Sequence, residues 1–157
     1  MNMIKTDDDV IINMSKFNEL ALLQDLDIPF YGGQIKTHFT PFRSGRWKVT
    51  TEEFPASKYP TYCPGGGYTL NKLAINALLK VHRSGVQPVL IYVEDVYVGV
   101  LASLAKVTPV SLSSTFHMNN PQLWCKEPAT VVTTCLSICI KLTWNASVNT
   151  ELFVYND

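Results

Sequence analysis

The chain has 157 residues and no net formal charge, because 13 basic residues balance 13 acidic ones, and 46% of its residues are hydrophobic. This length and composition suit one folded domain with a hydrophobic core and argue against a disordered chain. No basic stripe is present, so nothing in the charge pattern favours nucleic-acid binding.

The first predicted elements surround an acidic segment. Residues 1–6 are typical of the end of a hydrophobic strand, residues 7–9 are acidic, and residues 10–13 form another short apolar run. We expect a strand, an acidic turn and then a second strand or a helix entry. A helix with apolar residues at helical spacing follows, capped by Asn13 or Ser15.

The next part of the chain, residues 28–62, is predicted to be rich in strands and loops. Glycines indicate turns at residues 31–33 and at residues 44–45. Residues 47–49 are typical of a strand, and several prolines then predict an irregular stretch.

Regular patterns return after the glycine run at residues 65–67. Apolar spacing predicts a helix from residue 70 to about His82, ended by Ser84 and Gly85. Residues 89–93 predict a short buried strand, and a second helix is expected from residue 96 to residue 105. Residues 111–115 look like a loop, and residues 129–142 suit either a strand pair or a buried helix.

An acidic triplet, Asp7, Asp8 and Asp9, is the first motif that can carry chemistry. Three adjacent carboxylates repel one another, and a divalent cation with a preference for oxygen ligands, such as Mg²⁺ or Mn²⁺, relieves that repulsion. On a turn, the outer side chains of an Asp-x-Asp pattern can face one ion, so Asp7 and Asp9 are the expected ligands. The alternative is a solvated acidic turn or a cluster at a helix N-terminus.

An acidic pair, Glu94 and Asp95, directly follows the expected buried strand. This placement puts the pair at the carboxyl edge of a sheet, where open α/β sheets hold ligands. A carboxylate there can act as the general base on a hydroxyl group. The alternative is a helix N-terminus, which favours acidic residues through its dipole.

The glycine run and a histidine are the remaining candidates for a site. The run Gly65, Gly66 and Gly67 permits close backbone approach to a ligand, and its alternative is a flexible turn. No Gly-Lys-Ser/Thr follows, so it is not a P-loop. A neutral imidazole at His117 can complete a metal shell. The four cysteines contain no CxxC pair and give little support to a zinc cluster; they are Cys63, Cys125, Cys135 and Cys139.

Neither a membrane span nor a secretory signal is expected within the chain. The most apolar segment, residues 129–142, contains Thr, Ser and Lys and is shorter than the ~20 residues of a membrane helix. The first residues lack the apolar stretch of a secretory signal.

Three segments occur in an order that resembles one known family: IKTDDDV at residues 4–10, YPTYCPGGGY at residues 59–68 and EDVYVG at residues 94–99. The chain is similar to the β-1,3-galactosyltransferases and β-1,3-N-acetylglucosaminyltransferases, which form glycosyltransferase family 31. The similarity covers about residues 1–107 and reaches residue 123 through the stretch at residues 117–122. Residues 124–157 stay unassigned.

The resemblance implies a GT-A-like α/β fold, in which helices flank a mixed sheet. Residues 1–157 are then one partial catalytic domain, incomplete because its N-terminal nucleotide-binding portion is missing. The implied enzyme is an inverting hexosyltransferase that moves galactose or N-acetylglucosamine from a UDP-sugar donor, with Mn²⁺ or Mg²⁺. The acceptor is a glycan on a glycoprotein or glycolipid, and the new linkage is β-1,3. The full-length family implies a type II membrane protein of the Golgi lumen, held by an anchor absent from this chain.

The resemblance also implies roles for matching residues. The expected metal ligands are Asp7, Asp9 and His117, and the expected catalytic residues are Asp95, as the base, and its neighbour Glu94. The residues expected to bind the nucleotide and its ion are Asp7, Asp8 and Lys5. The expected substrate-binding residues are Gly65, Gly66, Gly67, Tyr68 and Tyr62. Tyr62, Tyr68 and Trp47 can each stack on sugar rings or belong to the core, and for Trp47 we expect the core.

Two other functions are compatible with some of the same residues. A non-catalytic fragment or pseudo-transferase would bind sugar or nucleotide without turnover. A phosphohydrolase would use the aspartate triplet with Mg²⁺, but it leaves the EDVYVG segment without a role.

Overall fold

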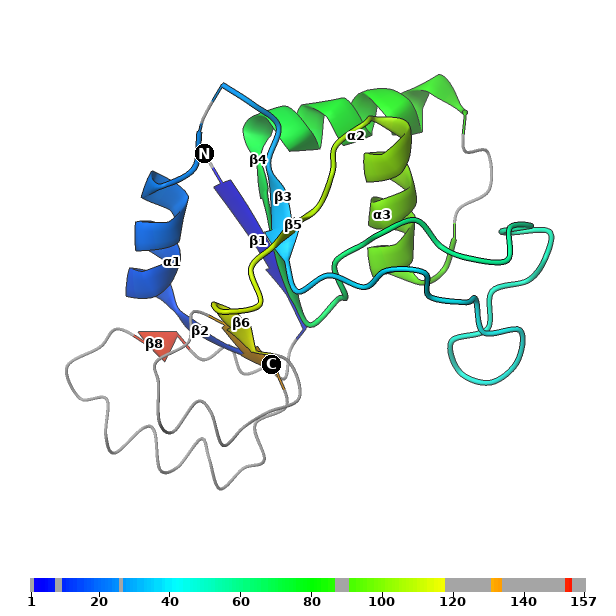
Figure 1. The fold of residues 1–157 in the computed structure, drawn as a ribbon, viewed down its shortest axis with the longest axis horizontal. Helices are drawn as coiled ribbons and strands as arrows, with labels where there is room; N and C mark the ends of the chain where they lie inside the picture. Colours follow the sequence, from blue (N-terminus) through cyan, green and yellow to red (C-terminus); the bar gives the residue numbers. More distant parts are fainter. Residues whose placement is uncertain are drawn as a thin grey trace.

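The computed structural model describes residues 2–7, 10–25, 27–86, 91–117, 131–133 and 152–153. Within these ranges the chain forms two four-stranded sheets and three helices (Figure 1). The helices are α1 (Met14–Leu22), α2 (Lys72–Ser84) and α3 (Glu94–Leu104). The expected α/β class, with helices flanking a mixed sheet, is confirmed.

The first sheet has the order β1-β4-β3-β5 and carries both antiparallel and parallel pairs. Its central strand, β4, runs antiparallel to β1 and to β3, and β5 runs parallel to β3. The register places Thr6, the last residue of β1, opposite Gly67, the first residue of β4. The end of β1 therefore meets the glycine run. The strands are β1 (Asn2–Thr6), β3 (Tyr31–Gly33), β4 (Gly67–Asn71) and β5 (Val110–Ser111).

The second sheet has the order β6-β7-β2-β8. Strand β2 begins directly after the acidic triplet and pairs antiparallel with β7 and β8, while β6 runs parallel to β7. This sheet joins the start of the chain to segments far along it. Its strands are β2 (Val10–Asn13), β6 (Phe116–His117), β7 (Val131–Thr133) and β8 (Leu152–Phe153).

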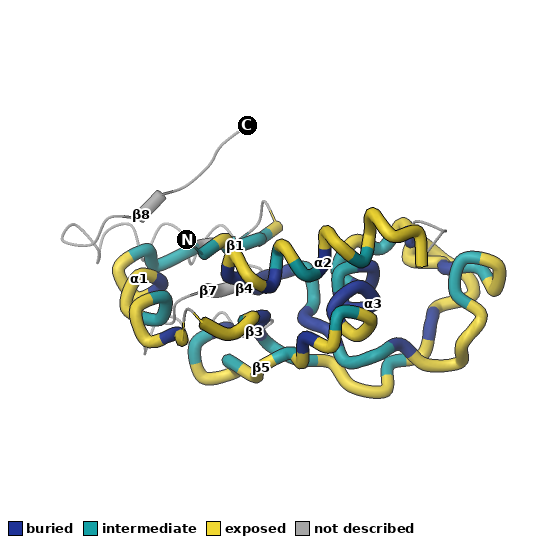
Figure 2. The backbone as a smooth tube through the Cα atoms, turned by 90° about the horizontal axis from the view of Figure 1, so that it is seen from above, coloured by how far each residue is buried: buried dark blue, intermediate teal, exposed yellow. Residues whose placement is uncertain are grey.

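The helices begin and end at residues whose types explain the boundaries. Of the two expected caps for α1, the structure uses Asn13, whose side chain accepts a hydrogen bond from the N–H of Lys16 at 3.1 Å. Asn71 caps α2 in the same way, and Gly85 ends it in the left-handed conformation that glycine adopts without strain. Helices α2 and α3 pack together, and two views place them on the other side of the first sheet from α1 (Figures 1 and 2).

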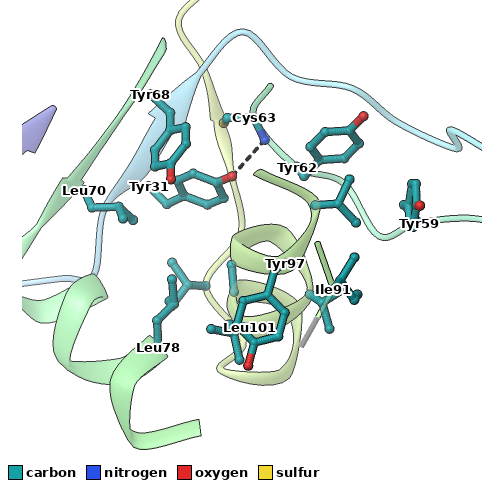
Figure 3. Close-up of a cluster of buried hydrophobic side chains, with 14 of the residues drawn as sticks. Tyr31, Tyr59, Tyr62, Cys63, Tyr68, Leu70, Leu78, Ile91, Tyr97 and Leu101 are labelled. Carbon is teal, nitrogen blue, oxygen red and sulfur yellow. Dashed lines mark hydrogen bonds between the residues drawn. The ribbon is translucent and has the colours of Figure 1, made fainter. Parts of the chain in front are cut away.

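The core lies between the first sheet and helices α2 and α3 (Figure 3). Tyr31 and Tyr68, from neighbouring strands, are fully buried and meet edge to face with ring centroids 5.6 Å apart. The buried hydroxyl of Tyr31 accepts a hydrogen bond from the N–H of Cys63 at 2.8 Å. That bond fixes the chain immediately before the glycine run.

Several local predictions were wrong. Residues 31–33 form strand β3 rather than a turn, and residues 47–49 form no strand. Residues 91–93 are not a strand, residues 89–90 lie outside the described part, and α3 begins at Glu94, before the expected start at residue 96. Ser111, expected in a loop, ends β5.

The glycines of β3 are needed for close approach rather than for a turn. A Cβ on Gly32 would come within 2.8 Å of the Phe30 ring, and one on Gly33 would come within 2.9 Å of the Gly67 carbonyl oxygen. Real Cβ atoms do not approach so closely, so glycine is required here by packing and not by the turn that was predicted.

None of the helices in the described ranges has both the length and the apolar character that a membrane span requires.

Candidate functional site

A cavity of about 440 Å³ opens beside the end of β1, the glycine run and the start of α3. Its lining is of two chemical kinds. The charged residues are Lys5, Asp7, Glu94 and Asp95, and the aromatic residues are Phe39, Phe42, Trp47, Tyr59, Tyr62 and Tyr92. Gly65, Val93 and Val96 complete it. Segments distant in the sequence thus contribute to one concave surface of the size that small-molecule sites have.

Strand β1 positions Lys5 and Asp7 at the cavity. The Lys5 ammonium donates to Asp7 Oδ1 at 2.8 Å and to the Gly65 carbonyl at 2.9 Å, and it lies 3.2 Å from Glu94 Oε2. One cation therefore joins the end of β1, the glycine run and the first turn of α3. Burial lowers the pKa of Lys5, but its bonds to Asp7 and Glu94 outweigh that effect and raise the pKa overall.

The first turn of α3 carries the acidic pair. Asp95 accepts hydrogen bonds on both carboxylate oxygens, from the Gly65 N–H on Oδ2 and from the Val96 N–H on Oδ1, each at 2.8 Å. Burial raises the pKa of Asp95 above its ordinary value, and the charge of Glu94 adds to the increase. The two N–H donors and Lys5 oppose the increase without cancelling it. The acidic pair is therefore a helix start, as the alternative reading expected, and it also lines the cavity, although residues 91–93 before it do not form the expected strand.

A side chain at Gly65 would crowd the Lys5 ammonium. A Cβ there would lie 3.1 Å from Lys5 Nζ and 3.6 Å from both Asp7 Oδ1 and Asp95 Oδ2. The position is thus surrounded by the charged groups of the site. Gly66 and Gly67 are buried, and Gly67 is already part of β4. Of the three glycines, Gly65 is the one that lines the cavity.

The two tyrosines named with the glycine run occupy different positions. Tyr68 is 1% exposed, and its hydroxyl donates a short hydrogen bond to Glu94 Oε1. Burial is the main reason why the pKa of Tyr68 is raised. Tyr62 is also mostly buried but lines the cavity, and burial raises its pKa to about 12. Tyr68 therefore supports the acidic pair from within the core.

The preference for Trp47 as a core residue was wrong. Its side chain is 48% exposed and lines the cavity, with the Arg46 guanidinium 4.8 Å from its ring. A loop of aromatic and proline residues without strand or helix periodicity carries it, so periodicity gave no information about which way the ring would face. Phe39, Phe42, Tyr59 and Tyr92 line the same cavity and were not predicted from the sequence. The density of aromatic residues between positions 39 and 62 was the signal that could have found most of them.

The expected metal ligands are described only in part. Asp7 fits as a ligand, because its half-exposed carboxylate lines the cavity and offers the hard oxygen donor that Mn²⁺ or Mg²⁺ takes. Asp8 and Asp9 lie outside the described residues, and for His117 only the backbone, in β6, is described. Within the described ranges, no group of three or more His, Cys, Asp or Glu side chains is arranged to hold a metal ion.

Comparison with known proteins gives a consistent result. A family model described as galactosyltransferase matches residues 2–113. The chain is 32% identical over 111 residues to beta-1,3-galactosyltransferase 5 of Mus musculus, which covers 69% of the chain and 35% of that protein. It is 33% identical over 98 residues to the Homo sapiens protein of the same name, and this match covers 61% of the chain and 31% of the human protein.

A more distant relative is beta-1,3-galactosyltransferase 2 of Mus musculus, which is 27% identical over 121 residues, 74% of the chain and 28% of that protein. The chain spans about a third of the length of the curated relatives that it matches.

Proposed function

This chain belongs to the galactosyltransferase family, and from that premise we propose that its cavity is part of the active site of a metal-dependent, inverting glycosyltransferase. The proposed donor is a UDP-sugar carrying galactose or N-acetylglucosamine, the acceptor is a glycan hydroxyl, and the fold is of the GT-A kind. The observation that carries the proposal is that Asp7 and Asp95, from opposite parts of the matched region, line one cavity.

Asp95 is the proposed general base. Its carboxylate is held by the N–H groups of Gly65 and Val96, which fix its orientation while the side chain lines the cavity. A raised pKa brings a carboxylate closer to the operating pH, where it is a more effective proton acceptor. The acceptor oxygen loses its proton to Asp95 as it attacks the anomeric carbon, and the bond from that carbon to the diphosphate breaks. A single displacement of this kind inverts the anomeric configuration.

Asp7 is proposed to hold the cation at the part of the cavity that binds the donor diphosphate. When bound, a divalent cation supplies Lewis-acid stabilisation of the charge on the leaving diphosphate. Asp7 offers it an oxygen ligand, and Asp9 is the second ligand that the sequence pattern suggests. Lys5 holds Asp7 and the Gly65 carbonyl in place. Glu94 contacts both Lys5 and Tyr68, and these contacts fix the first turn of α3 beside Asp7.

The Asp95→Asn substitution tests the proposal. Asparagine keeps the size of the side chain but cannot accept the proton, so sugar transfer from UDP-galactose or UDP-N-acetylglucosamine should fall by roughly 10²–10⁴-fold. Binding of UDP in the presence of Mn²⁺, measured by calorimetry, should change little. Asp27→Asn, at an exposed aspartate outside the cavity lining, is the matched control and should transfer normally.

Three results would contradict parts of the proposal. Near-normal transfer by Asp95→Asn would remove the base assignment. A wild-type chain that binds UDP with Mn²⁺ but neither transfers nor hydrolyses either UDP-sugar would be a nucleotide-binding module without turnover. A chain that fails to bind UDP would leave the cavity without its proposed donor.

A further inference from the structure

Residues 39–59 form a loop that brings Phe42 and Trp47 to the cavity, and we propose that this loop binds the acceptor sugar by stacking against its ring. This segment is called the aromatic arm below. The inference rests on the proposed function, since it names the part of the same site that would take the acceptor. In Figure 1 the arm is the cyan-to-green loop that extends beyond α3.

The aromatic arm is a closed loop with a defined base. The N–H of Tyr59 donates to the Phe39 carbonyl at 2.8 Å, which brings the two ends together. The N–H of Val49 donates to the Phe42 carbonyl at 2.8 Å, and the Val49 side chain is fully buried. These contacts hold both sides of the loop although it contains no helix or strand.

Arg43 organises the interior of the arm. Its guanidinium donates to four carbonyl oxygens, those of Val49, Thr50, Phe54 and Ala56, at 2.8–3.0 Å. The rigid fork of an arginine can bridge several acceptors at once, which the single ammonium of a lysine cannot do with the same geometry. Arg43 thus shapes a loop that displays its neighbour Phe42 and, a few residues later, Trp47.

The rings of the arm are packed against neighbouring side chains and are partly exposed. Phe42 packs edge to face on Phe39 with centroids 5.4 Å apart, and Arg46 lies over the Trp47 ring. Phe42 is 51% exposed and Trp47 is 48% exposed. Ordered aromatic side chains that keep accessible surface lose little entropy on binding, which makes them effective contact residues.

The arm lies on the side of the cavity that belongs to the proposed base. Tyr59, at its end, and Tyr62, just beyond it, line the same cavity as Asp95. Tyr62 also packs against Gly99 of α3, the helix that carries Asp95. A ligand on the arm is therefore near the group that would accept its proton.

The chemistry of this surface fits a neutral sugar rather than a diphosphate. The Arg43 guanidinium is engaged by backbone carbonyls, and the half-exposed rings of Phe42 and Trp47 offer apolar surface. A pyranoside whose C–H groups gather on one ring face can pack that face on an aromatic ring and turn its hydroxyl edge toward carboxylates. Glycosides of β-galactose have that form, and β-linked N-acetylglucosamine offers axial C–H groups on either ring face.

Binding of simple glycosides tests the inference without relying on turnover. Methyl β-D-galactopyranoside and methyl N-acetyl-β-D-glucosaminide are titrated into the chain, with and without UDP and Mn²⁺, and their affinities are measured by saturation-transfer NMR. Trp47→Ala and Phe42→Ala should each weaken binding of the preferred glycoside by about tenfold or more, because each removes a stacking face. UDP affinity should stay within about twofold of the wild type.

Two further variants separate the arm from general effects on stability. Leu79→Ala removes an apolar side chain that is 40% exposed on α2 and outside the cavity lining, and it should leave glycoside affinity unchanged. Arg43→Lys keeps the charge but loses the fork, so it should weaken glycoside binding while UDP affinity is retained. Because Arg43 acts through the arm, it is a positioning residue.

The outcomes distinguish this inference from the proposed function. Unchanged glycoside affinity in Trp47→Ala and Phe42→Ala, or a wild-type chain that binds neither glycoside under either condition, would overturn the inference. If the wild-type chain transfers no sugar but these variants still lose glycoside binding, the role of the aromatic arm is supported and the proposed transferase function is refuted. If both variants transfer sugar normally with an unaltered KM for the acceptor, the proposed transferase function is supported and the role of the aromatic arm is refuted.

Discussion

Asp95 illustrates how a single side chain can belong to a helix end and to a site at once. Its carboxylate receives two backbone N–H groups, which favour the charged form, yet its burial favours the neutral form more strongly. Glu94 adds a like charge on the same turn, and Lys5 opposes both. The net effect is a pKa above the ordinary value of about 3.9 for aspartate.

This raised pKa predicts the pH dependence of transfer. Asp95 must be deprotonated to accept a proton, so the acidic limb of the kcat/KM profile should lie at higher pH than an unperturbed aspartate would give. The measurement is kcat/KM for sugar transfer between pH 4 and pH 8, determined at intervals of about half a pH unit. An acidic limb that survives unchanged in Asp95→Glu and Asp95→Asn would assign the limb to another group.

The same shift has a consequence for stability with the opposite sign. The folded chain holds the Asp95 proton more tightly than the unfolded chain does, because the folded-state pKa is the higher one. The contribution of Asp95 to the free energy of unfolding is therefore lost as the pH rises from the unfolded-state pKa through the folded-state pKa. Against Asp95→Asn, the wild-type chain should become relatively less stable across that window.

At the residue scale, sequence patterns indicated the charged part of the site more fully than the aromatic part, of which Tyr62 was an expected substrate-binding residue. Asp7, Glu94, Asp95 and Gly65 stand in motifs whose spacing and chemistry can be recognised, and all four line the cavity. The exposure of Trp47 could not be predicted, because Trp47 lies in a loop that is held by contacts such as the bonds from Arg43 to four carbonyls. No local pattern encodes such contacts.

At the scale of elements, the helices followed from the sequence more closely than the strands. Helix α2 has apolar residues at helical spacing, an asparagine cap and a terminal glycine, which are local signals. Strand β3 has only three residues, two of them glycine, and it exists because its neighbours are close on both sides. The strands of the second sheet depend on pairing between distant segments, which periodicity does not reveal.

Helix α3 packs on the loop around Tyr62 at Gly99, and this contact allows a test at the same scale. A Cβ at position 99 would overlap the Cβ of Tyr62, whose backbone is tied to Lys36 by two hydrogen bonds. Gly99→Ala should therefore destabilise the fold by about 1–3 kcal/mol, as overpacking does. Thermal unfolding measures the loss, with Ala102→Gly in the same helix as a variant that removes rather than adds a methyl group. A Gly99→Ala chain as stable as the wild type would show that the helix and loop can separate at no cost.

At the scale of the whole molecule, the cavity exists only because the chain brings three separate segments together. The end of β1, the stretch from the aromatic arm to the glycine run, and the start of α3 each supply part of the lining. Both the α/β class and this convergence were expected from the family resemblance, because local patterns indicate single helices and strands but not how they come together.

Ligand binding should consequently stabilise the molecule as a whole. At a hundredfold excess of UDP over its Kd, with Mn²⁺ present, the free energy of unfolding should rise by about 2.7 kcal/mol. The midpoint of thermal unfolding should rise by several degrees as a result. Asp7→Ala should abolish the metal-dependent part of the rise, and Asp27→Ala should preserve it. An equal rise in Asp7→Ala would exclude Asp7 as a ligand of the ion.

The ion pairs around Lys5 also affect the order in which metal and nucleotide bind. One ammonium faces the carboxylates of Asp7, Glu94 and Asp95, so the formal charge at the cavity stays negative when all three are ionised. A nucleoside diphosphate approaching that surface alone meets repulsion, which is felt further out as ionic strength falls, because the screening length grows. A divalent cation that arrives first would offset this negative charge and so remove the repulsion. Metal before nucleotide is thus the electrostatically favoured route, and dilute buffer should make nucleotide binding without metal weaker rather than stronger.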